Sequence, residues 1–171
     1  MVDEQEFEQM VAVVYPRIRR AALLLSKGNV WDADDLAQET LLQAAWSWSK
    51  FNGNSRVETW LYSILLNQHR RHQRSTGRML RRWLGWLERN RHDSTHESAD
   101  SGLLAKEWKA NLWDAVSRLP EPQRETVVLR YSEGLSYEEI AQVLKCPLGT
   151  VKSRLHLAMT SLQKGLKEHV R

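Results

Sequence analysis

Apolar residues recur at intervals of three and four along nearly the whole 171-residue chain, and this spacing constrains the fold more than any other feature. It is the spacing of one face of an α-helix, whereas a half-buried strand would alternate apolar and polar residues. Alternating runs are nearly absent. Since 42% of the residues are apolar and 27% are charged, the predicted helices can bury a core. The sequence therefore predicts an all-α protein.

The first part of the chain is predicted to contain four helices. Pro16 is expected to separate the first helix from the second, because proline is favoured at the start of a helix. A third helix is predicted from about Asp32 to Trp48 and a fourth from about Val57 to Arg74. The loop 51–55, rich in glycine and asparagine, separates these two helices.

Polar, aperiodic sequence then separates this part from a second helical part. We expect a first small helical domain over residues 1–74, a flexible basic and polar linker over 75–102, and a second small helical domain over 103–171. Within the linker, the stretch MLRRWLGWLER is predicted to form a short amphipathic helix that either packs on a neighbour or contacts a regulator.

Charge is distributed unevenly, although the net charge is only +4. Arginines crowd the segment 70–91, whereas the segment 32–39 is acidic, which indicates two surfaces with different partners. The single cysteine, Cys146, excludes an intramolecular disulfide and a cysteine-rich zinc site and fits a reducing cytoplasm. With no apolar run long enough to span a membrane and no signal peptide, a cytoplasmic protein is expected.

The stretch LSYEEIAQVLKCPLGTVKSRLHLAM predicts two short helices joined by a corner. Ser136 and Glu139 form a capping box that begins the first helix, and Pro147 and Gly149 are expected to force the corner. In the second helix one face is predicted to be buried and the opposite face exposed; the buried face consists of Val151, Leu155, Ala158 and Leu162, and the exposed one of Lys152, Ser153 and His156, with Arg154 on a flank. Such donors match a DNA major groove, so a helix-turn-helix is predicted. The alternative is a hairpin used only for packing.

The acidic helix carries a second candidate surface. Asp35, Gln38, Glu39 and Leu42 stand three or four positions apart and share one face, whereas Ala33, Ala37, Thr40 and Ala44 share another. A leucine among carboxylates suggests a docking surface for a protein with basic residues, because the carboxylates would repel DNA. The alternative is a solvated acidic face.

The loop and the helix that follows it suggest a third surface. Trp60, Tyr62 and Asn67 precede Arg70, Arg71 and Arg74. Aromatic, amide and guanidinium groups together suit single-stranded nucleic acid. Taken singly, Trp60 and Tyr62 are instead expected in the core.

In this order the segments resemble the extracytoplasmic-function sigma factors, the smallest members of the bacterial sigma-70 family. DADDLAQET resembles region 2.2, FNGNSRVETWLYSI region 2.3, and LLNQHRRHQR region 2.4, while LPEPQRETVVLRY through GLSYEEIAQVLKCPLGTVKSRL resembles regions 4.1 and 4.2. The resemblance implies a two-domain, non-enzymatic promoter-specificity subunit without a cofactor or metal.

The resemblance also implies a role for individual residues. Docking on the clamp helices of the largest subunit of core RNA polymerase is implied for Asp35, Gln38, Glu39 and Leu42. Binding of a flipped base and the adjacent strand of the minus-ten element is implied for Phe51, Gly53, Asn54, Ser55, Asn67, Arg70, Arg71 and Arg74. Binding of the minus-thirty-five element is implied for Lys152, Ser153 and His156, with Thr150 and Arg154 on phosphates.

Two further points concern regulation and DNA affinity. Proteins of this family are usually inhibited by an anti-sigma factor, often membrane-anchored, so such a partner is expected. The chain departs from the family at Leu157 and Met159, where arginines are usual. Fewer phosphate contacts weaken DNA binding at every sequence and lower its salt dependence.

Two other classes of protein share some of these features. A helix-turn-helix repressor or activator would bind duplex DNA without polymerase, but no ligand pocket or dimer helix is evident in the first domain. An enzyme would need an active site, and His92 and His96 are the only metal pair suggested by spacing, within a polar linker.

Overall fold

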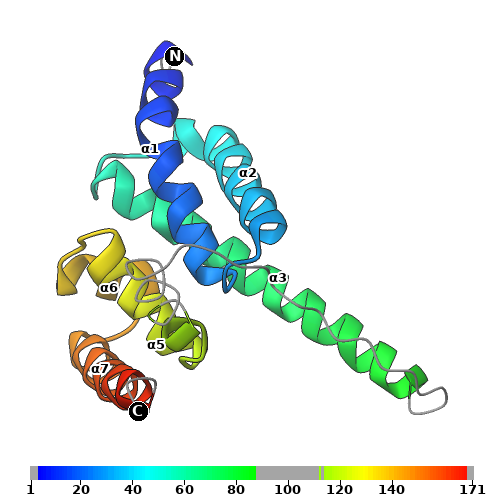
Figure 1. The fold of residues 1–171 in the computed structure, drawn as a ribbon. Helices are drawn as coiled ribbons and strands as arrows, with labels where there is room; N and C mark the ends of the chain where they lie inside the picture. Colours follow the sequence, from blue (N-terminus) through cyan, green and yellow to red (C-terminus); the bar gives the residue numbers. More distant parts are fainter. Residues whose placement is uncertain (1–3, 88–111, 113, 169–171) are drawn as a thin grey trace, which may run out of the picture.

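The structure, a computed structural model, describes residues 4–87, 112 and 114–168, of which the side chains of residues 4, 76–87 and 166–168 are not described (Figure 1). The described residues form helices, turns and loops, and no strand occurs among them. The all-α prediction is confirmed. We call the helices before residue 88 the N-terminal module and those after residue 111 the C-terminal module.

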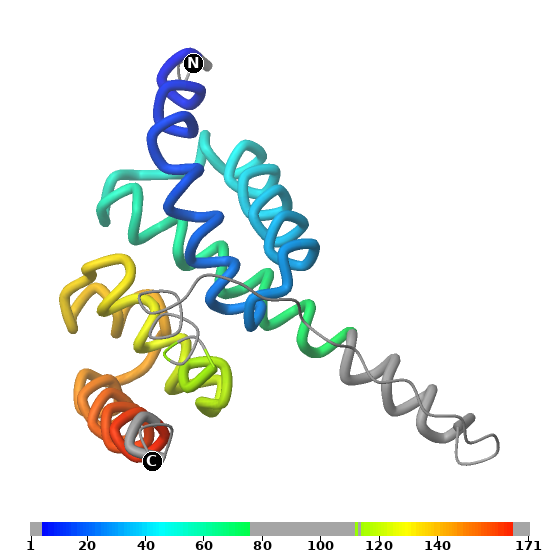
Figure 2. The backbone as a smooth tube through the Cα atoms, viewed as in Figure 1, coloured from blue at the N-terminus to red at the C-terminus, as the bar shows by residue number. Residues whose placement is uncertain are grey.

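The N-terminal module consists of α1 (Glu4–Leu25), α2 (Val30–Ser47), the short 3-10 helix η1 (Trp48–Lys50) and α3 (Val57–Leu87). The three long helices pack against one another (Figures 1 and 2). Their contact surfaces bury apolar side chains of all three helices, among them Ile18, Ala22, Leu36, Leu61 and Leu65.

The prediction that Pro16 separates two helices is wrong, because α1 continues through it. A proline inside a helix removes one backbone hydrogen bond and costs about 3 kcal/mol. Val14 and Ile18, on either side of it, are both buried. The burial of the stripe on both sides of the proline offsets this cost. The helix ends instead at Leu25, before Gly28, whose φ of +84° reverses the chain.

The predicted end of the fourth helix at Arg74 is also wrong, since α3 extends to Leu87. Ser75, Thr76 and Gly77 lower helix propensity by about 2 kcal/mol in total, but none of them blocks helix formation as proline does. The Ser75 hydroxyl donates to the His72 carbonyl at 2.8 Å. The first part of the predicted linker is therefore helical, whereas residues 88–102 lie outside the described residues.

The C-terminal module consists of α5 (Glu121–Val127), the π-helical turn η2 (Val128–Ser132), α6 (Tyr137–Leu144) and α7 (Leu148–Glu168). The predicted capping box is present: Glu139 N–H donates to the Ser136 hydroxyl at 3.1 Å, and Ser136 N–H donates to the Glu139 carboxylate at 2.8 Å.

The corner between α6 and α7 differs from the prediction. Lys145, rather than Gly149, adopts the left-handed conformation, with φ +52°. Gly149 lies inside α7. Pro147 stands just before α7, and its carbonyl accepts the Thr150 and Val151 N–H groups at 2.9 and 3.3 Å. Proline therefore begins the second helix rather than only ending the first.

The two modules pack against each other through α3 and α6 and through α1 and η2. Figure 2 shows α6 beside the first turns of α3. Two helical modules were predicted, but contact between them was not.

Candidate polymerase-docking and DNA-binding surfaces

The predicted docking residues share one face of α2. Asp35, Gln38, Glu39 and Leu42 are all exposed, while Ala33, Ala37, Thr40 and Ala44 on the opposite side are buried. Glu39 lies 2.7 Å from His72 Nε2 of α3, which holds that carboxylate at the edge of the face. This face is polar, acidic and open, with Leu42 as an apolar group 55% exposed.

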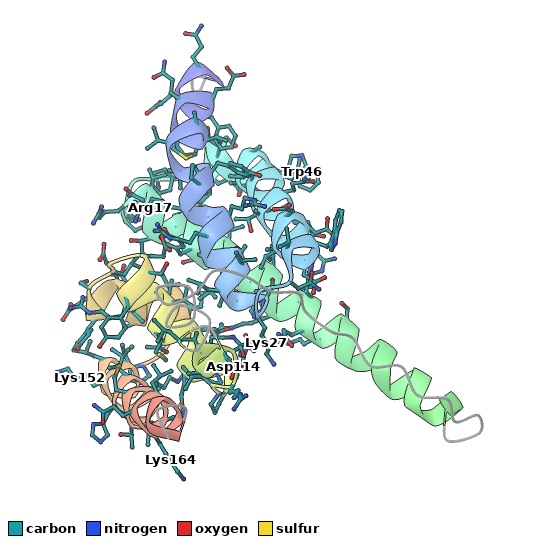
Figure 3. All side chains as sticks on the ribbon, viewed as in Figure 1. Arg17, Lys27, Trp46, Asp114, Lys152 and Lys164 are labelled. Atoms are coloured by element: carbon teal, nitrogen blue, oxygen red, sulfur yellow. The ribbon has the colours of Figure 1, made fainter. Side chains whose placement is uncertain are left out.

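Two tryptophans on the same helix were not predicted as site residues. Trp31 is 83% exposed and Trp46 is 75% exposed, and Figure 3 shows Trp46 pointing away from the other helices. A signal was present in the sequence, because both residues fall within 60° of Leu42 at 100° per residue. They extend the exposed face that carries the four predicted docking residues along most of α2.

The loop 51–55 begins in an aromatic cluster. The Phe51 ring stacks on Trp48, with 5.6 Å between ring centroids and 14° between planes, and lies 5.1 Å from the Trp60 ring. Trp60 is half-buried against the core, and Phe51 is half-buried as well. Gly53, with φ +71°, turns the chain so that exposed Asn54 follows it.

The residues of α3 predicted to bind an unpaired strand are in different environments. Asn67, Arg71 and Arg74 are exposed. Arg70 instead donates two hydrogen bonds to Glu125 of α5, at 2.9 and 2.7 Å. This hydrogen bonding raises the pKa of Arg70. One of the arginines predicted to bind DNA is therefore hydrogen-bonded to the C-terminal module instead.

A buried carboxylate forms the centre of the contact between modules. The side chain of Glu133, just after η2, is 0% exposed. It accepts a short hydrogen bond from the Tyr62 hydroxyl and one of 2.6 Å from Ser132. Arg20 Nη2 lies 3.4 Å and Arg17 Nε 3.6 Å from its oxygens. Burial, and then the hydrogen bond to Glu133, raises the pKa of Tyr62.

Two further glutamates join the modules. Glu121 of α5 forms short hydrogen bonds with His69 of α3 and with Arg124. Burial alone would raise the pKa of Glu121, but these partners outweigh it and the pKa is lowered. Glu139 of α6 lies 3.6 Å from Arg56, and its pKa is lowered chiefly by the Ser136 backbone N–H.

The exposed face of α7 matches the prediction. Lys152, Ser153 and His156 are exposed, whereas Thr150 and Arg154 are half-buried at its edges; Figure 3 shows Lys152 on the outer side of α7. The opposite face buries Val151, Leu155, Ala158 and Leu162. A recognition helix needs this arrangement, in which a packed seam fixes the orientation of outward donors. Leu157 and Met159 are also exposed.

No cluster of three or more metal-ligating side chains occurs among the described residues, and His92 and His96 lie outside them. No helix in the described part of the chain is both long and apolar enough to cross a bilayer.

The fold and its surfaces define a class of protein: two helical modules, of which the second ends in a helix-turn-helix with an outward basic helix. Comparison with known families agrees. The family model for Sigma-70 region 2 matches residues 10–79, and the model for Sigma-70, region 4, matches residues 109–162.

Individual relatives show which group of sigma-70 proteins the chain belongs to. The RNA polymerase sigma-H factor of Pseudomonas aeruginosa is 34% identical over 146 residues, which cover 82% of this chain and 76% of that protein. The ECF RNA polymerase sigma-E factor of Haemophilus influenzae is 30% identical over 171 residues, 96% of this chain and 89% of the relative. The chain belongs to the extracytoplasmic-function (ECF) sigma factors of the sigma-70 family.

Solved structures share the fold. The sigma factor RpoE of Bartonella quintana, crystallised with the anti-sigma factor NepR, is 32% identical with a TM-score of 0.78; the match covers 95% of this chain and 98% of RpoE. CnrH, solved with the cytosolic domain of CnrY, has a TM-score of 0.70 at 24% identity, with 98% of this chain and 91% of CnrH covered.

Proposed function

We propose that this ECF sigma factor docks on the clamp helices of the largest core polymerase subunit through Asp35, Gln38, Glu39 and Leu42. The observation that carries the proposal is the presence of two open faces of opposite character, acidic on α2 and basic on α7. A protein that bound DNA alone would have no use for the acidic face, which repels phosphate. The acidic face therefore serves a protein partner.

The open face of α7 serves duplex DNA. Lys152, Ser153 and His156 face the bases of the minus-thirty-five element, and Thr150 and Arg154 contact phosphates beside it. These groups project from a helix whose other side is fully packed, so their positions are set before DNA binds.

The minus-ten element is bound by the N-terminal module as an unpaired strand. Phe51, Gly53, Asn54, Ser55 and Asn67 surround one flipped base, and Arg70, Arg71 and Arg74 hold the adjacent backbone. Capture of a flipped base offsets part of the few kcal/mol that unstacking costs, so recognition promotes melting.

Strand capture in this form requires the modules to separate. Arg70 is paired with Glu125, and the second module lies against α1 and α3. Most cations of the interface are partly exposed: the side chains of Arg17, Arg20 and Arg70 retain 36%, 53% and 32% of their accessible surface. Their carboxylate partners Glu133 and Glu125 are buried, so opening the interface costs free energy. Contacts with polymerase and promoter DNA would have to offset this cost.

An anti-sigma factor is the proposed regulator. The support is the relative RpoE, which was crystallised with such a partner and matches nearly the full length of this chain. The chain itself performs no reaction in this proposal, because core polymerase carries out the chemistry. It acts in the cytoplasm, where polymerase and promoters are. Anti-sigma factors of this family are often membrane-anchored.

Run-off transcription with purified core polymerase on genomic fragments tests the proposal. The native chain should direct initiation at specific sites. Asn67→Ala should fail mainly at promoter opening, measured by permanganate reactivity, and Lys152→Ala mainly at upstream recognition, measured by footprinting. Tight duplex binding by the chain without core, together with no initiation in its presence, would instead favour a repressor or activator.

A further inference from the structure

The outer face of α2 is longer than the four predicted docking residues. Trp31, Leu42 and Trp46 are 83%, 55% and 75% exposed. At 100° per residue these three lie within 60° of one another around the helix axis. They form a continuous stripe about 22 Å long. Asp35, Gln38 and Glu39 lie between the two tryptophans.

Exposed tryptophans at both ends of a polar face indicate an interaction surface. Tryptophan is enriched among the few residues that dominate binding energy, because it buries a large apolar area. The Trp31 side chain stands at the start of α2, where Asn29 caps the helix by accepting the Trp31 and Asp32 N–H groups. Its backbone position is therefore fixed by a capped helix end, although the residue is 83% exposed.

We propose that Trp31 and Trp46 are the apolar anchors of the polymerase-docking face, which then spans Trp31 to Trp46 rather than Asp35 to Leu42. The partner surface has two apolar patches about 22 Å apart, separated by basic residues that meet Asp35 and Glu39. The inference rests on the proposed function, because it assigns these anchors to the clamp helices of the largest polymerase subunit.

Charge distinguishes this partner from two others. A second copy of the chain, docked symmetrically through the same face, would place Asp35 and Glu39 against their own equivalents, and like charges across an interface are unfavourable. DNA is excluded for the same reason. A basic protein surface with apolar pockets satisfies both kinds of residue, and the tryptophans are continuous with residues already assigned to polymerase.

The test measures binding to core polymerase by fluorescence anisotropy with the full chain labelled at Cys146. Trp31→Ala and Trp46→Ala should each weaken binding about tenfold or more. Val13→Ala, which alters an apolar residue 74% exposed on α1, should bind as the native chain does. Thermal unfolding should be unchanged in all three variants. Asp35→Ala tests the docking face independently of the tryptophans.

A photo-crosslinker identifies the partner. The substitution Trp46→benzoylphenylalanine should crosslink to the largest subunit of core polymerase. A crosslink to a second copy of the chain, or only to another subunit, would overturn the assignment.

The two hypotheses fail in different ways. If the native chain binds core and Asp35→Ala weakens binding while both tryptophan variants bind normally, the anchors are refuted and the proposed function survives. If the native chain does not bind core at all, the proposed function fails and the anchors fail with it.

Discussion

The N-terminal module has two charged faces that differ in almost every physical respect. The outer face of α2 is acidic, exposed and rimmed by uncovered tryptophans. The inner face, formed by α1 and α3, is basic, and glutamates of the C-terminal module cover it. The face assigned to polymerase is therefore free, whereas part of the face assigned to the unpaired strand is occupied.

This difference suggests an order of events. The proposed docking residues are exposed without any change in the contact between modules, whereas strand capture through Arg70 would require its pair with Glu125 to break. Glutamates 121, 125, 133 and 139 are the anionic partners of the basic face. If Arg70 holds the promoter strand as proposed, Glu125 competes with that strand for the same guanidinium group.

The largest effect is expected from Glu133→Ala. The substitution leaves the Tyr62 hydroxyl without its acceptor and two arginines without their shared anion, so the free energy of unfolding should fall by about 3 kcal/mol. Urea denaturation followed by circular dichroism measures it. Glu138→Ala, at an exposed position on α6, is the matched control and should change stability by less than about 0.5 kcal/mol. If the two variants were equally stable, the Glu133 carboxylate would not hold the C-terminal module against the basic face of α1 and α3.

A pair of neighbouring arginines sharpens the comparison. Arg70→Ala leaves the Glu125 carboxylate, 2% exposed, without its main partner, and should destabilise the protein by about 1–3 kcal/mol. Arg71→Ala, at an exposed position, should leave stability unchanged. Both should reduce open-complex formation if both arginines hold the strand. A loss of stability in Arg71→Ala, or none in Arg70→Ala, would contradict the placement of Arg70 at the contact between modules and of Arg71 on the exposed surface.

Acid should weaken the covered face by a smaller amount. The pKa values of Glu121 and Glu139 are lowered in the folded protein from their ordinary value of 4.5. Each carboxylate therefore stabilises the fold fully above about pH 4.5 and loses its contribution as pH falls through the lowered value. The urea concentration at half-unfolding should fall as the pH is lowered below 4.5. It should fall less steeply in Glu121→Gln than in the native chain. Identical pH profiles would exclude Glu121 from this dependence.

The open faces could be predicted from sequence and the covered one could not. Helical periodicity identified the buried seam of α7 and the small-residue face of α2. Both are local patterns, in which residues of one kind recur every three or four positions. Glu133 is buried against Tyr62 and Arg20, which are 71 and 113 residues away in sequence. A lone glutamate has no local signal of burial, since only its distant partners make burial favourable.

The errors in helix boundaries have the same origin. Pro16 and the Ser75–Gly77 run are valid local signals, each worth about 2–3 kcal/mol against a helix. Packing of α1 on α2 and α3 outweighs the proline. At the corner, Lys145 takes the left-handed conformation although Gly149 is close by, because the Lys145 and Cys146 N–H groups bond back to carbonyls of α6 and Pro147 cannot continue that helix.

The smallest effect concerns the open face of α7 and the departure at Leu157. This side chain is 54% exposed one turn after Ser153, so an arginine there would reach a phosphate beside the recognition face. Leu157→Arg should increase the slope of log K against log salt by about 0.9 for one added phosphate contact. Salt titrations of binding to a generic duplex measure this slope, since phosphate contacts do not depend on sequence. Gln9→Arg adds the same charge at an exposed position on α1 and should leave the slope unchanged. If both variants raise the slope equally, net charge rather than the α7 face governs duplex binding, and the distinction between that open face and the rest of the surface would be lost.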